Sequence, residues 1–155
     1  DQVSRGVYTL PEVWEDEFVS IQERYKRGVF ALDTALFLHD LTDRTPHKFH
    51  MAFPYGYNTS SPKAAGILCS CKKEPYYSLG IALVDTPAGN TVRAYNAEKT
   101  LCEILKPISH TDIQIITDAF KRYAGRKDKN IPLLSEYAHQ LRVEKRLRPY
   151  LEVLL

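Results

Sequence analysis

The stretch from Gly28 to Pro54, GVFALDTALFLHDLTDRTPHKFHMAFP, constrains the fold of this chain more than any other part of it. It reads as a short buried segment followed by an apolar helix, a polar turn and a strand. We expect Asp33 to cap this helix by accepting a hydrogen bond from a backbone N–H one turn on. Apolar residues cover nearly the whole helix, at Ala35, Leu36, Leu38 and Leu41. A helix of this kind is expected to lie deep in a domain.

A turn and a strand follow this helix. Residues 42–46, TDRTP, carry turn-forming side chains, and the residue before a proline avoids helical backbone. Apolar and other residues then alternate, with Phe49, Met51 and Phe53 between Lys48, His50 and Ala52. Such alternation is typical of a half-buried strand. The whole stretch therefore predicts a core, and it carries no catalytic pattern.

The flanking segments predict the remaining elements. An apolar stripe at Trp14, Phe18, Ile21 and Tyr25 predicts a helix from Pro11 to Gly28. Residues 55–63 read as a loop, and strand patterns continue to about residue 95, with a hairpin turn at 87–90. From Asn96 onward the apolar period is helical, and Ile113 begins the stripe of one of these helices.

These elements predict one domain of the α+β class. We expect a small mixed or antiparallel sheet in the middle of the chain, packed with helices, and a helical bundle at the C-terminal end. The 155 residues suffice for one ordinary core. No apolar run is long enough to span a bilayer, no signal peptide is visible, and three cysteines are an odd number, so we expect a cytoplasmic protein without a membrane partner.

Residue patterns for catalysis are missing from the sequence. His47 and His50 would lie on opposite faces of a strand, and His39 reads as a structural histidine at a helix end. Cys69 and Cys71 form a weak zinc signal and are better read as buried small residues. No Asp or Glu is followed two residues later by Lys, and no glycine-rich phosphate loop occurs. We therefore expect no enzyme activity, no cofactor and no metal.

Positive charge is concentrated near the C-terminal end of the chain. The net charge is +2, but residues 121–148 hold nine basic and three acidic side chains. The basic residues are Lys121, Arg122, Arg126, Lys127, Lys129, Arg142, Lys145, Arg146 and Arg148. We expect them to form a surface that binds an acidic partner or nucleic acid, the ordinary alternative being a solvated helical face. Residues 142–148, RVEKRLR, contain no amide side chain, which suits phosphate or acidic protein better than base readout. We also expect Arg142 to share one helical turn with the cations that follow it.

Several segments together resemble the AbiEi family, the antitoxins of type IV toxin–antitoxin and abortive-infection systems. They are TALFLHDLTDRTP at 34–46 with FP at 53–54 and GYN at 56–58, RGVY at 5–8 with LP at 10–11, YNAEKTLC at 95–102, KRY at 121–123 and YLEVL at 150–154. The resemblance covers nearly the whole chain. Asp40 is a departure, because the family usually has glycine there, which would suit a left-handed helix end.

This resemblance implies a division of the chain and a function. Residues 1–11 would be a remnant of the wing and linker of a missing winged helix, and residues 12–155 the C-terminal antitoxin domain. The domain would counteract a nucleotidyltransferase-like AbiEii toxin in bacterial phage defence, by a mechanism that in type IV systems need not involve direct binding. The full-length protein would also repress its own transcription by binding operator DNA through the winged helix. The alternative function is a nucleic-acid-binding regulatory module that uses the basic C-terminal helices.

Overall fold

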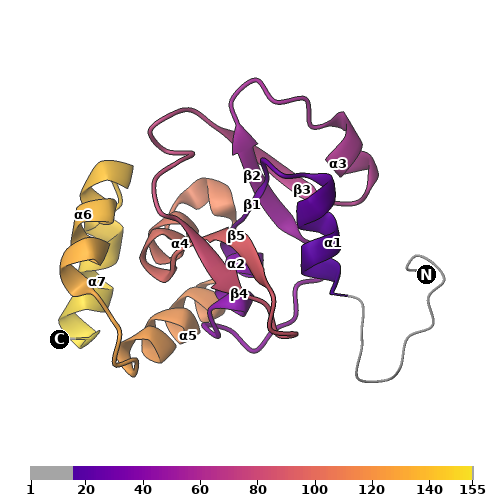
Figure 1. The fold of residues 1–155 in the computed structure, drawn as a ribbon. Coiled ribbons are helices and arrows are strands. Elements are labelled where there is room, and N and C mark those ends of the chain that lie inside the picture. The colour runs from indigo at the N-terminus through magenta and orange to yellow at the C-terminus, as the bar shows by residue number, and fades with distance from the viewer. Residues whose placement is uncertain (1–15, 155) are drawn as a thin grey trace.

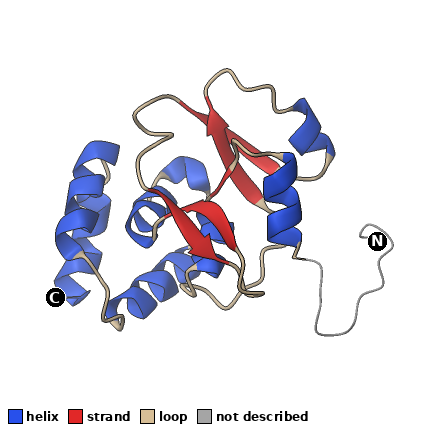
Figure 2. Ribbon diagram, in the orientation of Figure 1, coloured by secondary structure: helices blue, strands red, loops and turns tan. Residues whose placement is uncertain are grey.

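A computed structural model describes residues 16–154, and the expected wing remnant at 1–11 lies outside the described residues. The strands are β1 (Val29–Phe30), β2 (His50–Pro54), β3 (Leu68–Lys72), β4 (Ile81–Asp85) and β5 (Thr91–Tyr95). The helices are α1 (Glu17–Arg24), α2 (Leu32–Leu38), α3 (Ser60–Ala64), α4 (Ala97–Ile104), α5 (Ile113–Ala124), α6 (Ile131–Leu141) and α7 (Glu144–Leu154), with a 3₁₀ turn η1 (Pro107–Ser109). Figures 1 and 2 show the strands in the middle of the chain and the last four helices after them, which confirms the expected α+β class.

The five strands form one mixed sheet in the order β3-β2-β1-β5-β4. β2 pairs in parallel with β3, and β1 pairs in parallel with β5, while β1 with β2 and β4 with β5 are antiparallel. The antiparallel β4–β5 pair confirms the hairpin expected at 87–90. β1 is short because the chain turns into α2 at Leu32, which has φ 51°. The chain therefore passes directly from β1, the central strand of the sheet, into α2.

Apolar side chains cover both faces of the sheet. Phe18 of α1 packs on one face with Phe30, Met51 and Phe53, and Ala52 of β2 packs on the other. The expectation that β2 is half-buried was therefore wrong at Ala52, because neighbouring strands and the 73–80 loop enclose that face as well. α2 and the C-terminal helices share the largest cluster, which includes Leu36, Leu41, Leu101, Phe120, Leu134 and Leu147. In Figure 1, α6 and α7 lie at the opposite side of the molecule from α1.

Helix starts differ from expectation at α1 and α2. α1 begins at Glu17, because Asp16 is extended and its side chain accepts the backbone N–H of Phe18 at 3.0 Å; the start expected at Pro11 lies outside the described residues. Asp33 does not cap α2: the N-cap residue is Ala31, and Asp33 lies within the first turn. Burial raises the pKa of the Asp33 carboxyl.

Three further local expectations were also corrected. The 55–63 loop contains the start of a short helix, α3, where Asn58 accepts the backbone N–H of Ser60 at 3.0 Å. Cys71 is exposed rather than buried, because β3 is an edge strand of the sheet. Ile113 is 64% exposed, so the buried stripe of α5 starts at Ile116 instead. Among the described residues, no helix has the length and apolar character needed to cross a membrane.

The end of α2 explains why glycine would suit position 40. Asp40 has φ 58°, the left-handed conformation. The backbone N–H of Leu41 donates to the carbonyl oxygen of Leu36 at 2.9 Å, and the N–H of Asp40 donates to that of Phe37 at 3.1 Å. These two bonds form a Schellman motif, and buried Leu36 and Leu41 supply its apolar contact.

Replacing Asp40 with glycine should therefore stabilise the fold by about 1 kcal/mol, because glycine adopts positive φ without a Cβ penalty. Asp40→Ala should change stability in the opposite direction, since alanine tolerates this conformation less well than Asp. Urea unfolding of the three proteins measures both effects. A shift of the two variants in the same direction would contradict this account of the helix end.

Candidate functional site

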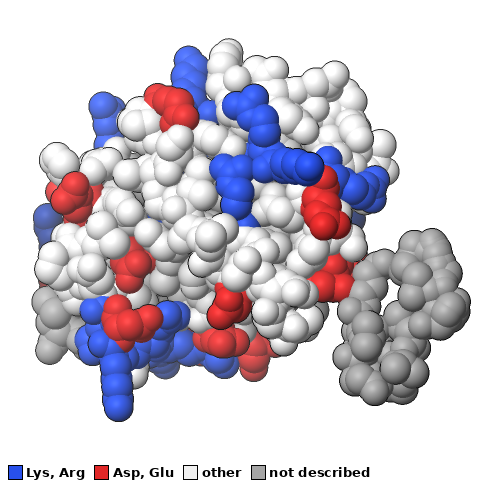
Figure 3. Space-filling model, in the orientation of Figure 1, with Lys and Arg blue, Asp and Glu red and all other residues white. Residues whose placement is uncertain are grey.

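The nine basic residues predicted as a functional surface fall into two groups in the structure. One group, Lys121 to Lys129, lies at the end of α5 and in the turn before α6. The other, Arg142 to Arg148, lies at the α6–α7 turn and along α7. The 11 residues of α6 separate the two groups by about 16 Å at 1.5 Å per residue. Figure 3 shows blue side chains mixed with red ones near the turn between α5 and α6.

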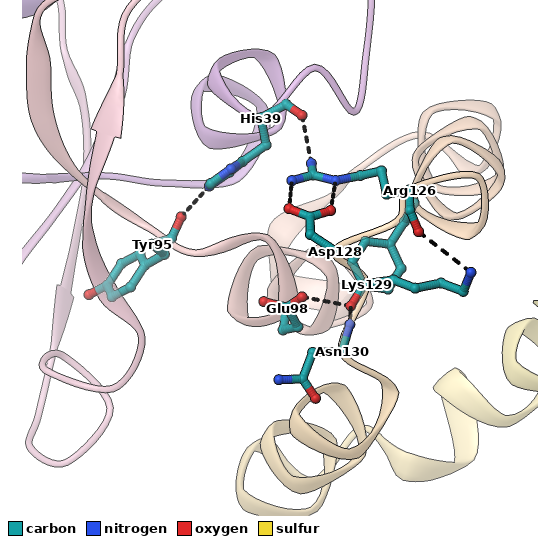
Figure 4. Close-up of polar contacts among 8 residues, drawn as sticks. His39, Tyr95, Glu98, Arg126, Asp128, Lys129 and Asn130 are labelled. Atoms are coloured by element: carbon teal, nitrogen blue, oxygen red, sulfur yellow. Dashed lines mark hydrogen bonds and ion pairs between the residues drawn. The ribbon is translucent and has the colours of Figure 1, made fainter.

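Two of the arginines in the first group are engaged in contacts within the fold. Arg126 forms a bidentate ion pair with Asp128 at 2.9 and 2.8 Å and donates to the carbonyl oxygen of His39 at 2.9 Å (Figure 4). The hydrogen bond to Asp128 raises the pKa of Arg126 and lowers that of Asp128. Arg122 pairs with Asp118 at 2.9 Å and lies 3.8 Å from Asp43. These guanidinium groups hold the α5–α6 turn against α2.

The lysines of the first group are exposed. The ammonium of Lys129 lies 3.5 Å from the carbonyl oxygen of Arg126, as Figure 4 shows. Within residues 16–154, Lys121 and Lys127 form no ion pair. They remain available to a partner, but the acidic side chains of Asp118 and Asp128 lie beside them in the same segment.

The second group is almost purely cationic. Arg142, Lys145, Arg146 and Arg148 are all exposed, and within the described part of the chain none of them lies within 4.0 Å of a carboxylate oxygen. The one acidic residue among them, Glu144, contacts His139 at 3.2 Å. Val143 and Leu147 are buried, which confirms the expected division between an apolar side and a cationic side.

Arg142 is not part of α7, contrary to expectation. It is the C-cap residue of α6, with φ 60°, and its backbone N–H donates to the carbonyl oxygen of His139 at 3.2 Å. α7 starts only at Glu144, because the buried Val143 donates its N–H back to Ala138 at 2.9 Å and reverses the chain. The side chain of Arg142 therefore projects from a tight turn rather than from a helical face.

A polar network connects the segments on which the family resemblance rests (Figure 4). His39, at the end of α2, places Nε2 2.8 Å from the carbonyl oxygen of Tyr95. The Tyr123 hydroxyl donates to Glu98 at 2.6 Å and accepts the N–H of Asn130 at 2.6 Å. Burial lowers the pKa of His39, so it serves as the structural histidine that the sequence indicated.

Helix α4 carries buried charged residues that the sequence did not reveal. Lys99 is fully buried, and its ammonium donates to the carbonyl oxygens of Tyr76 and Leu79, both at 2.8 Å. It also lies 3.7 Å from the centre of the Tyr95 ring. Burial lowers the pKa of Lys99 to about 8. Lys99 thereby attaches the 73–80 loop to α4. In the sequence, the one indication of this role was that Lys99 belongs to the YNAEKTLC segment of the family resemblance.

One groove lies beside the first basic group. It has a volume of about 570 Å³ and is lined by His39, Asp40, Asp85, Thr86, Arg122 and Arg126, with three apolar residues. Both arginines are paired with aspartates, and His39 is held by Tyr95. Across residues 16–154, no three His, Cys, Asp or Glu side chains are grouped so that they could hold a metal ion. Cys102 is buried, and burial raises the pKa of its thiol to about 12.

His50 makes the stability of the fold depend on pH. Burial, with a smaller contribution from the ammonium of Lys72, lowers its pKa from 6.5 to about 4. Between these pH values the unfolded chain binds a proton that the folded chain does not. The free energy of unfolding should therefore fall by about 1.4 kcal/mol per pH unit as the pH is lowered from 6.5, and by about 3 kcal/mol at pH 4.

Denaturant unfolding from pH 7 to 4 measures this loss. His50→Gln should flatten the pH dependence, because glutamine does not titrate in this range. His47→Gln is the matched control, since His47 is three residues away and exposed, and it should retain the full loss. An equally steep acid dependence in the His50→Gln protein would exclude His50 as the cause.

Comparison with known proteins adds no family to these observations. A scan against protein-family models found no model that matches this chain, and a search of curated proteins found no match either.

Proposed function

We propose that this chain is the toxin-suppressing domain of a type IV antitoxin, which counteracts a nucleotidyltransferase-like AbiEii toxin in phage abortive infection. The proposed functional surface is the cationic α6–α7 turn, formed by Arg142, Lys145, Arg146 and Arg148. The full-length protein would also act as a transcriptional autorepressor through a winged helix that binds operator DNA. The cytoplasm is the proposed location, and the three free cysteines fit its reducing conditions.

The observation that carries the proposal is the convergence of the resembling segments. The 34–46 segment, the 95–102 segment and the residues around 121–123 are far apart in sequence, yet they meet through His39, Glu98 and Tyr123. Asn96 caps α4 by accepting the N–H of Lys99 at 2.8 Å. Each of these polar residues bonds to another part of the domain, so the segments that resemble the AbiEi family contribute to the fold. This arrangement supports a protein that acts through its surface.

The charge distribution supports the α6–α7 turn as that surface. Like charges on one exposed turn repel each other by a few tenths of a kcal/mol per adjacent pair, so they do not stabilise the fold. Exposed cations that have no carboxylate partner within residues 16–154 remain free to bind an acidic protein surface or a phosphate. At the other end of α6, Arg122 and Arg126 already have such partners.

The alternative function, a nucleic-acid-binding module that uses all nine basic residues, is less well supported. The nine residues lie in two groups separated by α6, and the two arginines of the first group are engaged. A DNA-reading helix usually combines Lys and Arg with Asn, Gln or Ser for base edges, and 142–148 has none of these three. Contact of the second group with an acidic toxin, or with the toxin's target, fits its composition better.

Co-expression tests the proposed function. The chain is expressed together with an AbiEii-type nucleotidyltransferase-like toxin, and surviving colonies are counted with and without the chain. We expect the toxin alone to stop growth and the chain to restore colony numbers. Equal killing in the presence and absence of a soluble, folded chain would overturn the proposal. A pull-down of the two proteins then distinguishes direct binding from action on the target.

A further inference from the structure

A further group of cations comes from segments of the chain other than the α6–α7 turn. Figure 3 shows Lys and Arg side chains gathered on the upper part of the visible face, over the end of α1 and the neighbouring strand ends. We name this group the tyrosine–cation surface and define it as Lys26, Arg27, Tyr55, Lys73, Tyr76 and Arg93. These residues come from four segments of the chain, and none of them belongs to the proposed functional surface at the α6–α7 turn.

Hydrogen bonds tie the segment after α1 to β5 and to the 73–80 loop. Tyr77 donates its hydroxyl to the carbonyl oxygen of Arg27 at 2.6 Å. Arg93 donates to the same hydroxyl at 3.2 Å and to the carbonyl oxygen of Lys26 at 2.7 Å. These bonds use the backbone of Lys26 and Arg27, and leave both of their side chains exposed. Arg93 and the buried Tyr77 therefore hold the backbone of Lys26 and Arg27 beside the Arg93 guanidinium.

The 73–80 loop and the end of β2 bring a fourth cation and the tyrosines to this surface. The N–H of Tyr77 donates to the carbonyl oxygen of Lys73 at 3.0 Å, and the ammonium of Lys73 lies 4.9 Å from the centre of the Tyr55 ring. Tyr55 is 69% exposed, and Tyr76 in the same loop is 38% exposed. Exposed aromatic rings beside cations provide both a stacking face and positive charge to a ligand.

These cations form no close ion pairs in the described part of the chain, although Figure 3 shows acidic side chains nearby on the same face. Within residues 16–154, no carboxylate oxygen lies within 4.0 Å of the charged groups of Lys26, Arg27, Lys73 or Arg93. Glu74, which follows Lys73, instead accepts hydrogen bonds from the hydroxyl and N–H of Ser78 at 2.6 and 3.1 Å. The cations therefore suit a partner that supplies its own negative charge.

From this arrangement we infer that the tyrosine–cation surface binds single-stranded nucleic acid. The cations would contact the phosphates, and the Tyr55 ring would stack on a base, with Tyr76 available to a second. Exposed tyrosine rings favour nucleic acid over an acidic protein, because a base offers a π face. They favour a single strand over a duplex, because paired bases are already stacked. Binding of nucleic acid here does not depend on the proposed functional surface at the α6–α7 turn.

Fluorescence anisotropy of the full chain with a labelled oligothymidylate of about 20 nucleotides tests the inference. Replacing Lys26 and Arg27 with Glu should weaken binding more than about tenfold and reduce the slope of log K against log salt by at least about 1.4. Lys121→Glu with Lys127→Glu is the matched control, because it changes the net charge equally at exposed lysines that belong to neither proposed surface. That control should bind within about twofold of the parent.

Tyr55 supplies the test of stacking. Tyr55→Ala should weaken oligothymidylate binding about tenfold, whereas Tyr55→Phe, which keeps the ring, should bind like the parent. The inference is overturned if both charge-reversed proteins lose affinity equally, or if Tyr55→Ala binds as tightly as the parent. It is also overturned if a duplex of the same length or polyglutamate competes as well as the unlabelled single strand.

Discussion

Replacing Gly80 with alanine should destabilise this fold by about 3 kcal/mol. Gly80 has φ 83°, which costs a residue with a Cβ about 1–2 kcal/mol. A Cβ at this position would lie 2.8 Å from the Cβ of Lys99 and 3.1 Å from its Cγ. Lys99 cannot yield easily, because it is fully buried and its ammonium is held by two carbonyl oxygens of the adjacent loop. Crowding of this kind adds about 1–3 kcal/mol to the backbone strain.

Gly89→Ala separates the two contributions. Gly89 has φ 90°, but among the described residues nothing lies within 4 Å of a Cβ built there. This control should lose only the backbone contribution of about 1 kcal/mol, and the difference between the two variants measures the packing against Lys99. Urea unfolding gives both values. Equal losses at Gly80 and Gly89 would show that Lys99 is not held as tightly as its contacts indicate.

The sequence was informative where structure follows from local pattern. The apolar run from Ala35 to Leu41 correctly predicted a deeply buried helix, because a helix with apolar residues on all sides is stable only when all of its sides are buried. Asp40 has the left-handed conformation that suits the glycine which the resembled family usually has at this position. The helical period was correctly expected to begin at Asn96, which is the N-cap residue of α4.

Sequence reasoning failed where distant segments decide the outcome. α4 reads as an amphipathic helix with exposed Glu98, Lys99 and Glu103, yet every residue of this helix is buried. Their partners lie far away in the chain: Tyr123 for Glu98, the 73–80 loop for Lys99, and Lys72 for Glu103 at 2.9 Å. No periodicity within eight residues can reveal such partners.

The candidate surfaces show the same limit. Counting charges found the basic residues 121–148, but the count did not reveal that α6 separates them or that Arg126 is bound to Asp128. The tyrosine–cation surface was not predicted at all, because its cations are scattered between Lys26 and Arg93 in sequence. The bonds of Tyr77, together with the bond from Arg93 to the carbonyl oxygen of Lys26, bring their segments together.

Charge reversal at the α6–α7 turn should abolish protection from the toxin while leaving the fold intact. The variant combines Arg142→Glu, Lys145→Glu and Arg146→Glu. All three side chains are exposed, so each change should alter the free energy of unfolding by no more than about 0.5 kcal/mol. Carboxylates in their place would repel an acidic partner or a phosphate that the cations attract.

The matched control reverses three exposed lysines at the other end of α6, with Lys121→Glu, Lys127→Glu and Lys129→Glu. It changes the net charge by the same amount, and it leaves the ion pairs of Arg122 and Arg126 in place. Because this segment already contains acidic side chains, we expect the control to retain protection. Thermal melts establish first that both variants fold like the parent.

Colony counts under toxin expression are the most direct measurement of the central claim, that this chain suppresses a toxin through the cations of the α6–α7 turn. The parent and the Lys121, Lys127 and Lys129 variant should restore colonies, and the Arg142, Lys145 and Arg146 variant should give as few colonies as the toxin alone. Full rescue by the folded Arg142, Lys145 and Arg146 variant would contradict the account and place the functional surface elsewhere on the domain.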